Sequence, residues 1–381
     1  MDEKSLKPQL RFKEFTDAWE QRKFQDMFSF ERPDPYIVKS DKYSNEYTMP
    51  VLTANKAFVL GYTKENSPCK KTSLIFDDFT LECKYVDFPY MVKSSAIKIL
   101  TVKDEKKDNL RFSFERLNTT KIEILGHARH YISVVQPTKT RTPNILEQNK
   151  ISELFSNLDN LITLHQRKLD KLSNVKKALL EKMFPKNDSD VPEIRFKGFT
   201  DAWEQRKLSK IATMHARIGW QNLRKSEFLD SGDYYLITGT DFDDGKIDLK
   251  NCHYVAKERY EQDKNIQVKN GSILITKDGT LGKVAYVSNL QKPATLNAGV
   301  FNVELLTEDT DRKYLFQYLK APFLMSYVSQ KATGGTIKHL NQNILVDFPV
   351  IRPKKIEQQK IGTFFSNLDN LITLHQRKIS S

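Results

Sequence analysis

Residues 147–169 read EQNKISELFSNLDNLITLHQRKL, and residues 357–379 read EQQKIGTFFSNLDNLITLHQRKI. The two stretches are identical over fourteen residues, at 155–168 and 365–378. A second element, RFKEFTDAWEQRKF at 11–24, returns as RFKGFTDAWEQRKL at 195–208, with twelve of fourteen positions shared. The copies are offset by 210 and 184 residues, so the enclosed segments differ in length by 26 residues. Segments 25–146 and 209–356 share almost no sequence. We call the repeated elements the frames (11–24 with 147–169, and 195–208 with 357–379) and the unlike segments between them the inserts (25–146 and 209–356). This layout excludes a solenoid of short, similar units.

Both copies of the long repeat are predicted to be amphipathic helices. No Gly or Pro lies between Ile145 and Phe184, and Pro143 and Pro185 bracket this stretch. Steps of four and three alternate along an apolar seam, which is the 3.5-residue period of a coiled coil. The seam consists of Ile151, Phe155, Leu158, Ile162, Leu169, Leu172 and Leu179 in the first copy and of Ile361, Phe365, Leu368 and Ile372 in the second. The two copies most simply pack on each other about an approximate two-fold axis.

Three polar residues interrupt the seam. His165 and His375 occupy equivalent seam positions, and we interpret them as register markers or partner contacts rather than catalytic groups. Lys176 is expected to mark a place where the seam rotates or meets another protein.

The inserts are predicted to be domains of mixed strands and helices, an α/β (α+β) class. In the first insert, the predicted strands lie at 47–63, 73–78, 84–92, 96–100 and 131–135. In the second, they lie at 234–240, 272–287, 299–306 and 347–353, and residues 312–330 are predicted to be helical. Each insert with its leading frame has the size of one domain.

The charge balance favours a polyanionic partner. The 381 residues include 61 Lys plus Arg and 48 Asp plus Glu, a net charge of +13. Gly279 and Gly282 permit a tight turn in KDGTLGKV, which is either an ordinary hairpin or a loop that approaches phosphates and base edges. The candidate DNA-binding residues are Arg111, Arg116, His127, Arg129 and His130 in the first insert, and Lys277, Thr280, Lys283, Gly334, Gly335, Thr336, Lys338 and Asn341 in the second.

Several other functions find little support. The charged start is not a signal peptide, and no apolar run is long enough to span a membrane, so a cytoplasmic protein is expected. The three cysteines are widely spaced and suggest neither disulfides nor a metal site. There is no GxGxxG or P-loop, and PDPY at 33–36 lacks the neighbours that a methyltransferase loop requires. Asp77, Asp78, Glu82 and Lys84 crudely resemble a nuclease core, but a solvated strand explains them equally well.

The repeated layout resembles the specificity subunits of type I restriction-modification systems over essentially the whole chain. The motifs that carry the resemblance are FTDAWEQRK, KDGTLGKV, TGGTIKHLN with FPVIRP, and EQxKI with LDNLITLHQRK. It implies two target-recognition domains at 1–143 and 195–355, a first spacer helix at 144–185, a linker at 186–194 and a second helix at 356–381, with the helices forming an antiparallel coiled coil. Each domain would read one half of a bipartite, asymmetric DNA site.

The resemblance also implies partners that perform the chemistry. Two methyltransferase subunits would dock on the helices, and two motor-nuclease subunits would join for restriction. The subunit would have no catalysis of its own and bind no cofactor, because S-adenosylmethionine, ATP and Mg²⁺ serve adenine methylation and cleavage in the partners.

Two alternative functions remain, a scaffold and a stand-alone nuclease. A coiled-coil scaffold would show no salt-dependent DNA binding, and a stand-alone nuclease would nick DNA with a metal ion.

The second repeat stops soon after Ile379, whereas the first continues to Pro185. The distal seam of the first helix (Leu172, Leu179, Met183) is therefore expected to lack an intramolecular partner and to be covered by a methyltransferase subunit or a second copy.

Overall fold

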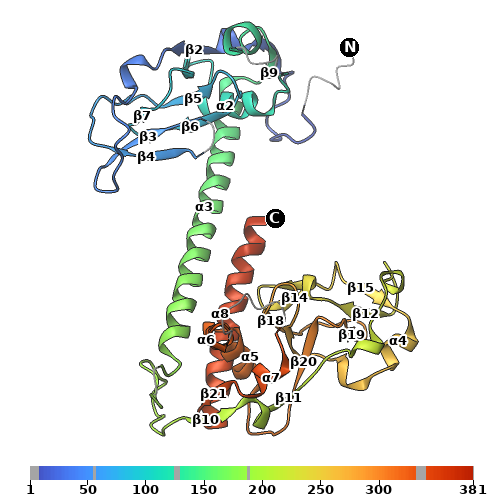
Figure 1. Cartoon of the computed structure of the whole chain (residues 1–381). Coiled ribbons are helices and arrows are strands. Elements are labelled where there is room, and N and C mark those ends of the chain that lie inside the picture. The colour runs from blue at the N-terminus through green and yellow to red at the C-terminus, as the bar shows by residue number, and fades with distance from the viewer. Residues whose placement is uncertain (1–7, 55–56, 124–128, 187–188, 332–339, 381) are drawn as a thin grey trace. The chain divides into compact units, whose positions relative to one another are not determined.

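The computed structural model describes residues 8–54, 57–123, 129–186, 189–331 and 340–380 (Figure 1). The chain divides into two compact units, an N-terminal unit, Met1–Leu161, and a C-terminal unit, Ile162–Ser381. Helix α3 (Ile145–Lys182) contributes its first part to one unit and its second part to the other. Within the described ranges, no helix has the length and apolar character that a membrane span requires.

The N-terminal unit is built around a four-stranded antiparallel sheet with the order β2-β8-β5-β6. Its strands are β2 (Phe28–Glu31), β8 (Ile97–Val102), β5 (Ser73–Asp77) and β6 (Cys83–Val86). A smaller sheet has the order β4-β3-β7, from β4 (Val59–Thr63), β3 (Met49–Leu52) and β7 (Met91–Val92). Side chains alternate along β5, so Leu74 and Phe76 face one apolar core and Ile75 faces another. One strand thereby separates the two cores of this unit.

The C-terminal unit repeats this arrangement with a different sequence. Its main sheet has the order β11-β20-β17-β18, from β11 (Ala212–His215), β20 (Val300–Leu305), β17 (Ile273–Thr276) and β18 (Val284–Tyr286). A second sheet has the order β15-β12-β19-β16, from β15 (His253–Val255), β12 (Tyr234–Ile237), β19 (Ala294–Leu296) and β16 (Gln267–Val268). Strand β17 again separates two cores, because Ile273 and Ile275 belong to one and Leu274 to the other. The two inserts therefore share a fold although their sequences do not align.

Each insert is closed at its base by the repeated frame. In the N-terminal unit, β1 (Glu20–Lys23) pairs antiparallel with β9 (Lys139–Thr142). In the C-terminal unit, β10 (Glu204–Lys207) pairs in the same way with β21 (Pro349–Arg352). The EQRK tetrapeptide supplies the first strand in both cases, which gives one physical reason for its repetition.

A glutamine at the start of each long helix fixes the helix that follows the main sheet. The Gln148 Oε1 atom accepts a hydrogen bond of 2.9 Å from the backbone N–H of Asn109, the N-cap of α2 (Leu110–Thr119). The Gln358 Oε1 atom accepts an equivalent bond of 2.9 Å from Asp311, the N-cap of α5 (Arg312–Lys320). Helices α3 and α8 (Lys355–Ser380) therefore begin at equivalent places in the two units.

In the C-terminal unit, the second part of α3 packs antiparallel on α8. Phe184 stacks on Phe365, and the Lys176 Nζ atom lies 2.5 Å from the Asp369 Oδ1 atom. Farther along, the His165 and His375 Nδ1 atoms are 2.9 Å apart. The residue numbers fall on α3 as they rise on α8, which confirms the antiparallel arrangement predicted from the repeat.

The direction of this pairing corrects one expectation. The distal seam of α3 does have an intramolecular partner, because Met183 is buried and Leu179 packs in the core that contains Phe365. An antiparallel partner places the end of α3 beside the beginning of α8. The prediction was wrong because it compared the two repeats as if their helices ran in the same direction. It therefore expected the second half of α3 to lack a partner.

Two secondary-structure predictions also need correction. Residues 131–135, predicted as a strand, form a π-helical turn in which the Gln136 N–H donates to the Tyr131 carbonyl oxygen, with the Tyr131 side chain buried. The predicted helical stretch 312–330 is two helices, α5 and α6 (Pro322–Lys331), because a break at Ala321–Pro322 ends the first. Helix α2 was not predicted.

Candidate nucleic-acid interface

The tip of the hairpin between β17 and β18 is fixed by hydrogen bonds to the hydroxyl group of a buried threonine. Gly279 and Gly282 adopt φ angles of 73° and 70°, where residues with a side chain are strained. The Thr276 hydroxyl donates to the Thr280 carbonyl oxygen and accepts a 3.0 Å bond from the Lys283 N–H. Thr276 is buried, whereas the side chains of Thr280 and Lys283 are exposed. The tip is therefore a defined turn that offers a hydroxyl and an ammonium group to the solvent.

The end of the second predicted loop of this unit, at Leu340, is bonded to the hairpin. The Leu340 N–H donates a 2.8 Å hydrogen bond to the Lys277 carbonyl oxygen, at the base of the tip. Asn341 is the N-cap residue of α7 (Gln342–Val346), yet its exposed side chain makes no capping bond. The structure thus brings Lys277 and Asn341 together from positions 64 apart in the numbering. Gly334, Gly335, Thr336 and Lys338 fall outside the described residues.

The Lys277 side chain is only half-exposed. Its ammonium nitrogen lies 5.5 Å from the centroid of the Phe301 ring, close enough for a cation–π interaction. This contact keeps the Lys277 ammonium group beside the Phe301 ring, so Lys283 is the more accessible cation of the tip.

The N-terminal unit has an equivalent hairpin that sequence analysis did not assign to DNA binding. The turn between β5 and β6 contains Leu81 at a φ of 62° and is held by the Asp77 carboxylate, which accepts from the N–H groups of Phe79 and Thr80. The His130 N–H donates 2.9 Å to the Asp78 carbonyl oxygen, the counterpart of the Leu340–Lys277 bond. Residues 78–82 read DFTLE and residues 278–282 read DGTLG, so three of five positions are identical. This short match, together with the topology, was the signal that could have identified the first hairpin.

Asp77 and Asp78, whose pattern crudely resembles a nuclease core, have structural roles here. Besides the turn held by Asp77, the Asp78 carboxylate accepts from the Tyr131 N–H and lies 3.3 Å from the buried Lys98 ammonium group. Among the residues that the structure describes, no group of three or more His, Cys, Asp or Glu side chains is placed to hold a metal ion.

The predicted basic residues of the N-terminal unit separate into two groups. Arg129 is exposed next to the hairpin, with its guanidinium carbon 6.0 Å from the centroid of the exposed Phe79 ring. His130 is only 1% exposed, and its Nδ1 atom is 3.2 Å from the Asp78 carbonyl oxygen. A ring buried to this extent does not reach DNA without local rearrangement, so its position does not support the expected contact. His127 lies outside the described residues.

Arg111 and Arg116 lie on α2 and are engaged within the unit. Arg111 forms ion pairs with Glu115 and Asp159, and its guanidinium group lies over the rings of Tyr85 and Phe114. Arg116 donates to the Thr140 hydroxyl in β9 and has its pKa lowered by burial. These contacts tie α2 to the frame and to α3, which gives both arginines a structural role whether or not they contact DNA.

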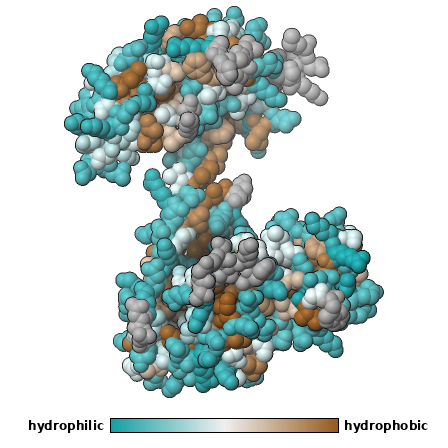
Figure 2. Space-filling model, viewed as in Figure 1, coloured by the Kyte–Doolittle hydropathy of each residue, from teal (hydrophilic) through white to brown (hydrophobic). Residues whose placement is uncertain are grey.

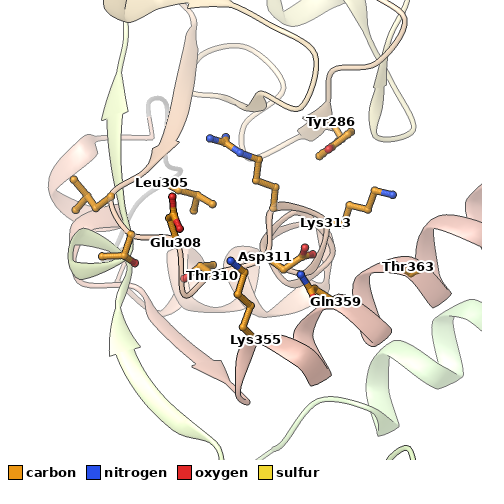
Figure 3. A pocket seen from close by; sticks show the side chains of 12 residues that line it. Tyr286, Leu305, Glu308, Thr310, Asp311, Lys313, Lys355, Gln359 and Thr363 are labelled. Carbon is orange, nitrogen blue, oxygen red and sulfur yellow. The ribbon is translucent and has the colours of Figure 1, made fainter.

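The described residues also line two cavities at equivalent places in the frames. In the C-terminal unit, a cavity of about 800 Å³ lies where α5 and α8 begin, and Figure 3 shows Asp311, Lys313, Lys355 and Gln359 around it. In the N-terminal unit, a cavity of about 640 Å³ is lined by Asp108, Asn109 and Asn149, among others. Neither lining includes a residue of the hairpin tips. The cavities and the candidate DNA-binding loops are therefore separate surfaces.

The predicted helix seam is covered along one helix and open along part of the other. Ile361, Phe365 and Ile372 of α8 are buried, Leu368 is half-buried, and Leu169, Leu172 and Leu179 of α3 are half-buried. By contrast, Phe155, Leu158 and Ile162 are exposed and Ile151 is half-buried. The same residue types therefore have different environments in the two copies.

Comparison with known proteins identifies the family. The sequence model of the type I restriction modification DNA specificity domain matches residues 16–174 and 200–381. The chain belongs to this specificity-subunit family. It is 28% identical over 356 residues to the specificity subunit of the Escherichia coli type I restriction enzymes EcoR124I and EcoR124II, covering 91% of this chain and 85% of that protein. It is also 22% identical over 258 residues to the MjaVIII specificity subunit of Methanocaldococcus jannaschii, covering 64% and 58% of the two chains.

The fold is also that of a solved family member. The crystal structure of a type I restriction-modification S subunit from M. genitalium superposes with a TM-score of 0.64 at 15% identity, covering 98% of this chain and 95% of that one. Both the family and the fold predicted from the sequence are thereby confirmed. Specificity subunits of this family are non-catalytic and supply sequence-specific DNA recognition, which agrees with the exposed loops described above.

Proposed function

We propose that each unit reads one half of a bipartite, asymmetric DNA site through its hairpin and the loop bonded to it. The observation that carries this proposal is the equivalent position of the two hairpins combined with the different side chains that they expose, Phe79 and Glu82 at one tip and Lys283 at the other. Each turn is held by a buried or capping side chain, and each is bonded at its base to a second loop. Two similar scaffolds that expose different side chains suit two different half-sites.

In this proposal, the side chains that contact bases and phosphates come from both inserts. Lys283, Thr280 and Asn341 act in the C-terminal unit, and Arg129 acts in the N-terminal unit. Arginine and lysine suit guanine O6 and N7, and asparagine suits adenine N6 and N7. The net charge of +13 adds a sequence-independent attraction for the phosphates.

We further propose that partner subunits perform the chemistry at the chosen site. Two methyltransferase subunits, using S-adenosylmethionine, methylate adenine, and two motor-nuclease subunits, using ATP and Mg²⁺, cleave unmethylated DNA. Support for a paired partner comes from Leu164 and Leu374, which occupy equivalent positions on α3 and α8 and are 50% and 48% exposed. An exposed leucine that recurs on both helices suits two copies of one docking protein.

The test is to express the chain with its methyltransferase partner in cells that lack other adenine methylation, and to sequence the modified sites. A single bipartite motif with two different halves is expected. The variant Lys283→Ala together with Asn341→Ala should relax or abolish one half and leave the other intact. Loss of specificity in both halves, or a single continuous motif, would contradict the assignment of one unit to each half-site.

A further inference from the structure

The turn between β5 and β6 of the N-terminal unit exposes one large apolar side chain, Phe79, which is 39% exposed. The Phe79 N–H donates a 3.0 Å hydrogen bond to the Asp77 carboxylate, and the neighbouring Asp78 carboxylate accepts a 2.8 Å bond from the Tyr131 N–H. Both aspartates are buried. The turn that carries the Phe79 ring is therefore held in one conformation before any ligand binds, which lowers the entropic cost of binding.

An exposed phenylalanine is not by itself a sign of function. Single apolar side chains are common on protein surfaces, and Figure 2 shows several apolar groups, in brown, on the visible face of the N-terminal unit. Phe79 differs from an ordinary exposed residue in two ways. It lies on the hairpin tip that is proposed above to read DNA, and the guanidinium carbon of Arg129 lies 6.0 Å from the centroid of its ring. An apolar ring and a cation thus occur together at the proposed DNA surface.

The C-terminal unit has no side chain at the equivalent position. The match between DFTLE at 78–82 and DGTLG at 278–282 aligns Phe79 with Gly279. A Cβ atom at Gly279 would meet no other atom of the described residues within 4 Å, its chain neighbours apart. The hairpin fold therefore does not require an aromatic ring at this position, so packing alone does not explain Phe79.

The chemistry of a phenyl ring limits what Phe79 can recognise. The ring has no hydrogen-bond donor or acceptor, so it cannot pair with the polar edge of a base. In the major groove, thymine is the base that presents an apolar group, its 5-methyl group, and phenylalanine suits contact with that group. Arg129 beside the ring suits a neighbouring phosphate, because guanidinium groups form strong hydrogen bonds with phosphate oxygens.

We propose that Phe79 is a specificity-determining residue that contacts the 5-methyl group of a thymine in the half-site of the N-terminal unit, with Arg129 on an adjacent phosphate. This inference rests on the proposed function, because it requires that the β5–β6 hairpin reaches the bases. It adds the class of base that this tip selects. Thymine is preferred over cytosine and over uracil, both of which lack the methyl group.

Deoxyuridine tests the contact directly, because it pairs with adenine as thymine does and lacks only the methyl group. The complex of the full chain with its methyltransferase partner is titrated with fluorescent duplexes that carry the bipartite site. Each thymine is replaced in turn in the half-site that the Lys283→Ala and Asn341→Ala variant leaves intact. One replacement should weaken binding about fourfold, the factor that corresponds to one buried methyl-sized group.

Two variants assign this methyl effect to a residue. Phe79→Ala should bind the thymine duplex at least about fourfold more weakly than the wild type and should lose nothing further with deoxyuridine. Phe88→Ala is the matched control, because Phe88 is 37% exposed in the same unit but packs edge to face with Phe58, between β6 and β7. It should keep the fourfold methyl effect. Thermal melting establishes that both variants fold.

Absence of a methyl effect in the wild type would overturn the proposal, even if Phe79→Ala bound more weakly, because the ring would then stack on a base or wedge between base pairs. Equal methyl effects in the wild type and Phe79→Ala would also overturn it, because another residue would then contact the methyl group. A bipartite methylation motif that persists in either case would keep the assignment of one unit to each half-site. Failure of this inference is therefore distinguishable from failure of the proposed function.

Discussion

At the scale of single residues, the repeated frame depends on one buried carboxylate in each unit. The Arg11 Nε and Nη2 atoms donate to Glu147 at 2.7 and 2.6 Å, and those of Arg195 donate to Glu357 at 2.7 and 2.8 Å. Glu147 and Glu357 are buried, and the pKa of each arginine is raised by this hydrogen-bonded partner. The pair joins the opening element to the long helix, which gives a second physical reason why both sequences repeat together.

Removing one partner of this pair should be costly. Arg195→Ala leaves the Glu357 carboxylate buried and unpaired, so the free energy of unfolding should fall by about 3–5 kcal/mol, measured by urea denaturation. Lys354→Ala is the matched control, because its ion pair with Asp201 is exposed on both sides and solvent screens it, so its loss should change the stability little. Equal, small losses in the two variants would show that the Arg195–Glu357 pair does not hold the frame.

Asn341 supports a second prediction at this scale. If its amide pairs with a base edge, Asn341→Ala should weaken binding to the specific site by about 1–3 kcal/mol and change binding to random DNA much less. Asn343→Ala, an exposed asparagine in α7, is the control that should leave both affinities unchanged. Fluorescence titrations with the two DNAs measure this. A parallel loss on random DNA would indicate a structural role for Asn341.

The surroundings of a residue could be predicted from the sequence only where the residues that it contacts lie close to it along the chain. The tip of Lys277, Thr280 and Lys283 was expected from its two glycines, because a turn is a local structure. The burial of His130 was not, because its partner Asp78 precedes it by 52 positions in the sequence. Residues 78–82 were compared only with a nuclease core, although the DFTLE sequence matches DGTLG at 278–282 in three positions. The sheet topology shows that each stretch forms the turn after the equivalent strand of its own unit.

At the scale of elements, the two long helices meet through a histidine pair. The His375 pKa is lowered, first by desolvation and then by the charges of His165, Lys168 and Lys378. Since the unfolded chain then binds more protons than the folded chain below about pH 6.5, the stability that depends on neutral His375 is complete above that pH and is lost as the pH falls. The repeat predicted both helices and their antiparallel packing. The antiparallel direction also decides which half of α3 is covered by α8, and this consequence was not predicted.

The helix pair should therefore be pH-sensitive. Between about pH 7.5 and about pH 5.5, the melting temperature of the chain should fall, and His375→Gln should reduce this fall because it removes the titrating group. His253→Gln, at an exposed histidine of β15 outside the helix pair, is the control for the removal of one imidazole. Calorimetry at several pH values measures the effect, and identical pH profiles for the wild type and His375→Gln would contradict it.

At the scale of the whole molecule, the excess of 13 positive charges predicts phosphate-dominated affinity. If about 5–10 phosphates are neutralised, log K should fall by roughly 0.9 for each contact per logarithmic unit of salt concentration. Filter binding across a salt series measures the slope. A slope near zero would support a scaffold that carries its charge incidentally.

The modular architecture supports a final prediction, because each insert is closed at its own base. In the N-terminal unit, the Phe24 N–H donates to the Thr138 carbonyl oxygen at 3.1 Å, and in the C-terminal unit, the Leu208 N–H donates to that of Phe348 at 2.8 Å. These bonds, next to the β1–β9 and β10–β21 pairs, mark where an insert can be cut out without opening the frame. The sequence located the frames by their identity, and the hydrogen bonds place the second cut of each insert after residues 137 and 347, nine residues before the ends of the unlike segments 25–146 and 209–356.

Replacing residues 209–347 with the equivalent insert of another family member should therefore change one half-site and preserve the other. Replacing residues 25–137 should have the converse effect, which makes each exchange the control for the other. The physical reason is that the exposed hairpins belong to the inserts, whereas the strand pairs, the Arg–Glu pairs and the glutamine bonds belong to the frames. Sequencing of methylated adenines in cells that express each chimera reads out both half-sites. If either exchange altered both halves at once, base recognition would extend across the two units, and the assignment of one half-site to each insert would be wrong.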